Sequence, residues 1–185
     1  GQPTDAAAEA QAKATRAPAG EASMAVDGVV VEGEYPHELT AASVRVLWRN
    51  DGETLWLAMV GQTTGWVSVG LAPELRMQGA NYVIGAVEDG AVTVWDAYGT
   101  APTGPTHPTD ESLGGTHDIT AFAGGEQDGV TTIEVALPLD SGDAYDKPLQ
   151  PGATIPIIVA VGRSDAYDAG HAARGSATLT LDPAL

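Results

Sequence analysis

The sequence of 185 residues contains no cysteine. Disulfides, thiolate metal sites, cysteine nucleophiles and cofactors attached covalently through cysteine are therefore excluded. Basic residues are also scarce: 8 Lys and Arg are set against 25 Asp and Glu, for a net charge of -17. So few cations cannot form a basic patch for nucleic acid. The negative field favours a cationic protein partner through steering, and a soluble surface in a salty habitat explains it equally well.

Long hydrophobic runs are absent too. No run approaches the roughly 18 apolar residues needed to cross a bilayer, and the longest, such as 155–161, have the length of a strand. The chain opens with Gly1 and has no apolar leader, as we expect for a mature or trimmed protein. Residues 1–22 are Ala-rich and lack large apolar side chains, which predicts a flexible tether. A tether after an export signal suits a secreted, periplasmic or cell-surface domain, including a lipoprotein with a lipid anchor upstream.

From residue 23 to residue 185 the pattern changes to alternation with period two, which is typical of strands with one buried face. Val44, Val46 and Trp48 share such a face. The hairpin signals 50–52 and 88–90 separate neighbouring runs. About ten strands are predicted, near 26–33, 43–49, 54–61, 66–71, 81–88, 91–97, 118–123, 130–137, 155–162 and 176–181.

This spacing predicts a single all-β domain, an antiparallel β-sandwich of the immunoglobulin-like kind. Three connections are long: 72–80, 98–117 and 163–175. Long ordered loops on a sandwich usually carry function, and we expect these at one end of it.

Motifs for catalysis are missing. The sequence has no G-x-S-x-G, H-E-x-x-H or H-x-H, no Walker loop and no dinucleotide fingerprint. Pairs of carboxylates are expected by chance among 25 acidic residues, so they do not indicate a catalytic site. We therefore expect a protein that is not an enzyme.

Two side chains in the long loops are candidate metal ligands. Met77 in the first loop offers a thioether, and His171 in the third offers an imidazole. Haem iron accepts this pair, and Met ligation raises the reduction potential of an electron-transfer haem. Spacing alone does not show that Met77 and His171 are metal ligands, because a loop Met usually fills a gap in a core and a lone loop His is usually solvated.

Three blocks of the sequence carry a resemblance to a known family. They read GWVSVGLAPELRMQGANYVIGAVEDGAVTVWDAY, GGTHDITAFAGGEQDGVTTIEVALPLDSGD and IIVAVGRSDAYDAGHAARGSATLTL. In this order they resemble the DOMON domain over roughly residues 25 to 182. Haem-binding members of this family include the cytochrome domain of cellobiose dehydrogenase, a β-sandwich that holds haem b between Met and His.

The resemblance implies that Met77 and His171 are the axial ligands of a non-covalent haem b. A related branch, the haem subunit of ethylbenzene dehydrogenase, uses Met and Lys, but only Lys13 and Lys147 exist here and neither lies in the His171 loop. Two protein ligands leave six-coordinate iron with no open position, which suits transfer of single electrons to or from a redox partner.

Other residues are assigned supporting roles in the same hypothesis. The expected apolar walls for the porphyrin are Trp66, Val83, Ile158 and Leu179. The expected partners of its propionates are Arg174, foremost, with Arg163, Tyr82 and Tyr98. Asp168 or a loop carbonyl is expected to orient His171. Among the other histidines, His37 and His107 are expected to be solvated, and His117 is the substitute ligand; Met24 and Met59 are expected in the core or a strand.

Two alternative hypotheses for the function remain. A haem-free module for carbohydrate or another ligand would build its platform from Trp48, Trp95 or Tyr98, if these are exposed. A haem sensor would have one displaceable axial ligand.

Overall fold

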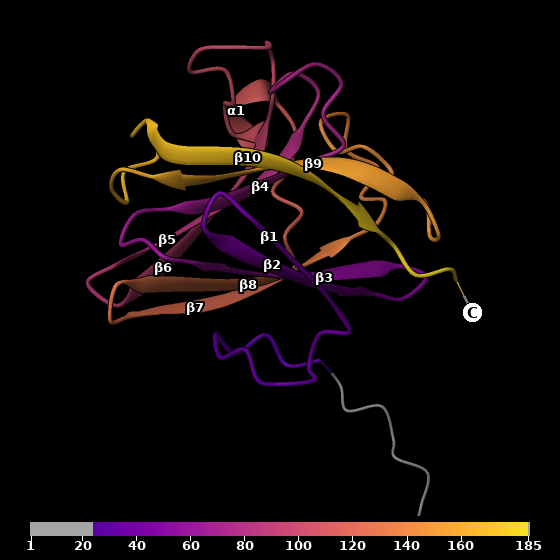
Figure 1. Cartoon of the computed structure of the whole chain (residues 1–185). Helices are drawn as coiled ribbons and strands as arrows, with labels where there is room; N and C mark the ends of the chain where they lie inside the picture. Colours follow the sequence, from indigo (N-terminus) through magenta and orange to yellow (C-terminus); the bar gives the residue numbers. More distant parts are fainter. Residues whose placement is uncertain (1–23, 185) are drawn as a thin grey trace, which may run out of the picture.

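The chain folds into two five-stranded antiparallel sheets packed face to face (Figure 1), in a computed structural model that describes residues 24–184. The predicted tether, residues 1–22, lies outside the described residues. The first sheet has the order β1 (His37–Ala41), β2 (Val44–Asn50), β3 (Thr54–Gly61), β8 (Val130–Pro138) and β7 (Ala121–Gln127). The second has the order β10 (His171–Thr180), β9 (Thr154–Gly162), β4 (Val67–Leu71), β5 (Asn81–Glu88) and β6 (Ala91–Tyr98). The predicted β-sandwich is confirmed.

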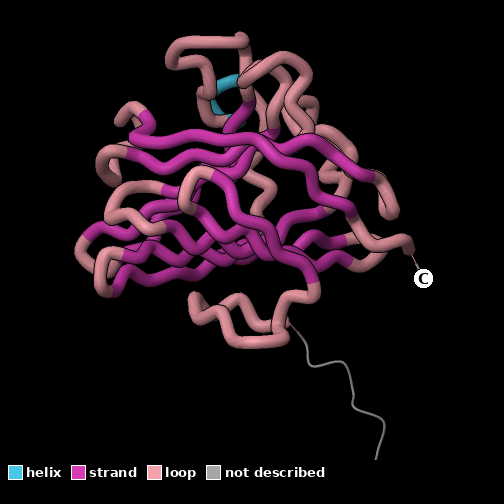
Figure 2. Tube along the Cα trace, viewed as in Figure 1, coloured by secondary structure: helices cyan, strands magenta, loops and turns pink. Residues whose placement is uncertain are grey.

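Helix is nearly absent from the described chain (Figure 2). The single turn α1 (Asp110–Leu113) lies within the long connection after β6. No helix in the part that the structure describes is long and apolar enough to cross a membrane.

The predicted strand at 26–33 is wrong. These residues run below β2 and β3 as an irregular segment (Figure 1), and the first strand begins only at His37. Gly28 and Gly33 have positive φ angles of 86° and 81°, which break the extended backbone that a strand over 26–33 requires.

A buried carboxylate fixes this N-terminal segment to the first sheet. Glu134 is fully buried in β8. Its carboxylate accepts hydrogen bonds from the Tyr35 hydroxyl at 2.7 Å and from the backbone N–H of Gly28 at 2.7 Å. Tyr35 also packs with Leu47 and Ala58. The N-terminal segment thereby covers the outer face of the first sheet around Leu47 and Ala58.

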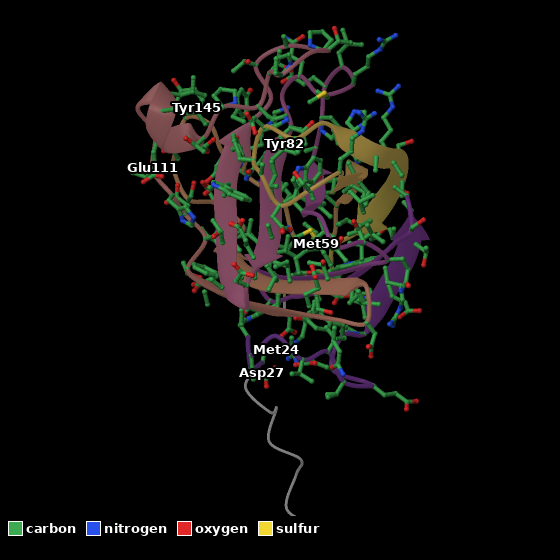
Figure 3. The ribbon with its side chains drawn as sticks, turned by 90° about the vertical axis from the view of Figure 1, so that its left-hand side faces the viewer. Met24, Asp27, Met59, Tyr82, Glu111 and Tyr145 are labelled. Atoms are coloured by element: carbon green, nitrogen blue, oxygen red, sulfur yellow. The ribbon has the colours of Figure 1, made fainter. Side chains whose placement is uncertain are left out.

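The main core fills the space between the sheets. Val44, Val46 and Met59 from the first sheet are fully buried there, as their alternation predicted, and Figure 3 shows Met59 at the centre of the molecule. From the second sheet, Val67, Val69 and Leu71 complete the same core. Every residue of β4 is buried, including those that face away from the core. At β4 the outer face of the second sheet is therefore covered as well, and the candidate site lies there.

Candidate functional site

A second apolar cluster lies on the outer face of the second sheet. It contains Trp66, Ala80, Tyr82, Ile84, Ala86 and Ala97, with Met77, Ile158 and Ala160 packed against it. A pocket of about 990 Å³ opens over this cluster, bordered by residues from all three long connections. Its size lies at the upper end of the range for small-molecule and cofactor sites.

His171 lines this pocket because β10 contains a β-bulge near its start. The strand begins at His171, so the prediction that His171 lies in a loop and that the strand starts at 176 is wrong. His171 pairs with Gly162 while Ala173 pairs with Val161, which leaves Ala172 as a bulge. The bulge shifts the register by one residue, so that His171 shares the outer face with Arg174 and lines the pocket. Among the described residues, the His171 ring has no hydrogen-bond partner.

Met77 lies at the tip of a tight turn over the same face. Leu75 and Gln78 exchange two backbone hydrogen bonds, of 3.3 and 3.0 Å, across this turn. Gly99 holds the loop to the end of β6, because its backbone bonds with Gly79 and Ala80. A Cβ at Gly99 would overlap the Met77 carbonyl oxygen. Met77 is half-buried and lines the pocket.

Most of the predicted supporting residues also line the pocket. Trp66 is buried, and its indole N–H donates to the Ala169 carbonyl at 3.2 Å. Tyr82 lies beside it on β5, where burial raises the pKa of its hydroxyl. Ile158 supplies a further apolar contact, while Arg163, Arg174 and Asp168 complete the predicted members of the lining.

Three predicted residues lie elsewhere. Val83 and Leu179 belong to the core between the sheets, so their assignment as porphyrin walls does not fit the structure. Side chains alternate between the two faces of β5, so Ile84, and not Val83, lines the pocket. Tyr98 is not part of the pocket lining; its ring packs on Tyr145 with 5.6 Å between ring centroids.

Three of the 8 basic residues of the chain line the pocket. Arg76, Arg163 and Arg174 all line it, and sequence reasoning missed Arg76. All three are exposed, and none forms an ion pair within residues 24–184. By contrast, Arg45 pairs with Glu38, and Lys147 with Glu74. Unpaired cations around one pocket in a protein of net charge -17 favour a ligand that carries acidic groups.

The histidines differ from expectation. His107 was expected to be solvated, but it lines the pocket, packs edge-on against Tyr167 and has a buried Nδ1 without a partner. Burial lowers the pKa of its imidazole. His37 is not simply solvated either, because its Nε2 lies 2.9 Å from the Asp182 carboxylate. His117 is absent from the pocket lining and contacts the Val94 carbonyl at 3.3 Å.

The aromatic residues proposed for a sugar platform do not form one. Trp48 is buried and donates its indole N–H to the Thr180 carbonyl. Trp95 packs against Tyr167 with 5.1 Å between ring centroids. Trp95 and Tyr98 are both half-buried.

The residues that line the pocket suit a flat, apolar group with a metal centre and carboxylates. Trp66, Ile84 and Ile158 provide apolar contacts, and one thioether and two imidazoles are available as metal donors. The three arginines provide counter-charges for carboxylates. The residues present thus fit a haem, and fit it without any contribution from cysteine.

Known proteins share the family and the fold of this chain. The family model for the DOMON domain matches residues 41–162. The cytochrome b domain of pyranose dehydrogenase from Coprinopsis cinerea is similar in structure, with a TM-score of 0.56 and 11% identity over 77% of this chain and 80% of that one. The cytochrome domain of cellobiose dehydrogenase from Myriococcum thermophilum gives 0.55 and 7% identity, over 79% and 81%.

A family 9 carbohydrate-binding module from Caldicellulosiruptor kristjanssonii, in complex with glucose, is less similar. Its TM-score is 0.44 and its identity 12%, over 84% of this chain and 81% of that one. No curated protein matches the sequence.

Proposed function

Because the chain belongs to the DOMON domain family, we propose that it binds haem b without a covalent link and carries single electrons. Both cytochrome domains named above share its fold. Bound haem would supply a couple between ferric and ferrous iron, and the protein would hold and tune it.

One observation carries this proposal: Met77 and His171, far apart in the sequence, line one pocket. These two side chains would hold the haem iron. Met77 would raise the reduction potential, and two protein ligands would leave iron no position for oxygen. The imidazole must be neutral to bind a metal, and Asp168, in the same pocket, would orient its other nitrogen.

The remaining lining residues would exclude water and orient the group. Trp66 is fixed by its bond to Ala169, so its ring offers a rigid apolar surface. Arg174 and Arg163 would hold the propionates, and Arg76 would join them. His107 is the rival imidazole, since it lines the same pocket and its Nδ1 has no partner.

In this proposal the domain is a carrier and not an enzyme. Its partner would be a second redox protein with a cationic docking face, attracted by the net charge of -17. An exported protein, secreted, periplasmic or at the cell surface, would agree with the family resemblance.

Absorption spectra of ligand variants test the assignment. Protein reconstituted with haem should give a low-spin spectrum. His171→Ala should abolish it, and Met77→Ala should retain haem with a lower potential. His107→Phe is the matched control, because it removes the other pocket imidazole and keeps an aromatic ring. If His107→Phe abolishes the low-spin spectrum and His171→Ala does not, the assignment of His171 is wrong.

A further inference from the structure

The core between the sheets becomes polar at one end. On β6 the inward-facing Val92 and Val94 are followed by Asp96, which is only 4% exposed. On the neighbouring strand β5, Asn81 precedes the inward-facing Val83 and is 5% exposed. The α1 turn packs against β6, and Figure 3 shows Glu111 and Tyr145 at this turn.

Three carboxylates from separate segments meet there. Asp96, Asp118 and Asp146 each place one oxygen within 4.8 Å of the others, and the described residues contain no second group of this kind. Neighbouring donors fix their orientation. The Asp118 N–H donates to Asp96 Oδ2 at 2.7 Å, and the Ser141 hydroxyl donates to Asp146 Oδ2 at 2.6 Å.

Two residues near this group, and one of its own members, carry buried oxygens that have no hydrogen-bond partner in the part of the chain that the structure describes. Asp110 is fully buried, and neither of its carboxylate oxygens accepts a hydrogen bond. Asn81 Oδ1 and Asp146 Oδ1 are likewise buried and unpartnered. The bridge between Ala97 and Thr109 brings Asp110 next to Asp96. Buried acceptors are normally satisfied, so these unsatisfied oxygens indicate a missing partner.

Among residues 24–184, no positive side chain forms an ion pair with this group. Lys147 is adjacent in sequence to Asp146, but its Nζ bonds to the Glu74 carboxylate and the Ala72 carbonyl. His117 acts on Asp96 only at a distance, and its Nε2 contacts the Val94 carbonyl. Burial, with repulsion from the neighbouring carboxylates, raises the pKa of Asp96 to about 7 and that of Asp110 to about 8.

We propose that Asp96, Asp118 and Asp146, with the unpartnered oxygens of Asp110 and Asn81, bind one Ca²⁺ ion. All these donors are oxygens, which hard cations prefer. Their number suits the six to eight oxygens of Ca²⁺, whereas Mg²⁺ keeps several waters and demands a small octahedral site. The ion would neutralise the carboxylates and join β5, β6, the segment after α1 and the loop after β8.

Calcium titration of the haem-free full chain, dialysed against EDTA, tests this proposal. Calorimetry should detect one Ca²⁺ per chain, with much weaker binding of Mg²⁺. At a hundredfold excess of Ca²⁺ over Kd, the Tm should rise by about 5–10 °C. Asp96→Asn should lose both effects. Glu111→Gln, which removes the same charge from an exposed neighbour of Asp110, should keep both.

Asp96→Asn removes repulsion, so the variant should fold even without the ion, and its unfolding curve verifies that. Three results would overturn the proposal: no Ca²⁺ binding by the wild-type chain, equal binding by Asp96→Asn, or equal affinity for Mg²⁺. None of them bears on haem, because the assay uses the haem-free protein.

Discussion

The three pocket arginines allow a quantitative test of the haem proposal. Arg76, Arg163 and Arg174 line one pocket, are exposed and lack ion-pair partners within the described residues. If they hold propionates, replacing all three with glutamine should weaken binding of haem. An exposed ion pair contributes about 0.2–1 kcal/mol, so three would contribute roughly 0.6–3 kcal/mol. The Kd for haem should then increase between about 3-fold and about 150-fold, because 1.36 kcal/mol corresponds to tenfold.

The assay is a titration of haem-free protein with haem, followed in the Soret band. Arg45→Gln is the matched control, because Arg45 pairs with Glu38 on the first sheet, away from the pocket. A second measurement uses the dimethyl ester of haem, whose propionates carry no charge. The triple variant should bind the ester as tightly as the wild type does. An unchanged Kd for haem itself in the triple variant, or an equal loss with Arg45→Gln, would refute the reasoning.

Two further predictions concern the parts that position the pocket and the sheets. Gly99→Ala should displace the Met77 loop, because its Cβ would overlap the Met77 carbonyl oxygen. Its spectrum and potential should resemble those of Met77→Ala, whereas Gly125→Ala, whose Cβ would meet nothing within 4 Å, should behave as wild type; a wild-type potential in Gly99→Ala would contradict this. Tyr35→Phe should lower the free energy of unfolding in urea by about 1.5–3 kcal/mol, because the hydroxyl bonds to the buried Glu134 carboxylate. Tyr145→Phe, which loses a bond to a backbone carbonyl, should cost about 0.5–1.5 kcal/mol, and equal losses in the two variants would contradict this prediction.

Sequence alternation predicted the architecture where each strand has one buried and one open face. Val44, Val46 and Trp48 were assigned correctly to the core for this reason. The alternation pattern failed to predict the orientation of side chains where both faces of a strand are buried. In β5 nearly every residue is apolar, so the pattern does not say which side meets the pocket, and Val83 was chosen where Ile84 lies.

The candidate site depends on features that a linear pattern does not contain. The bulge at Ala172 decides which face His171 takes, and only the register with β9 reveals it. His107 and Arg76 come from loops whose paths are set by long-range contacts, such as the bond from the Tyr167 hydroxyl to the His107 carbonyl. Met77 and His171 were found through family resemblance, which carries three-dimensional information that their spacing lacks.

The most direct test of the haem proposal is a spectrum of the reconstituted protein after reduction, recorded with and without carbon monoxide. Iron held by Met77 and His171 should give sharp α and β bands that carbon monoxide leaves unchanged. A protein that stays colourless would contradict haem binding, and a spectrum that shifts with carbon monoxide would contradict ligation by two fixed side chains.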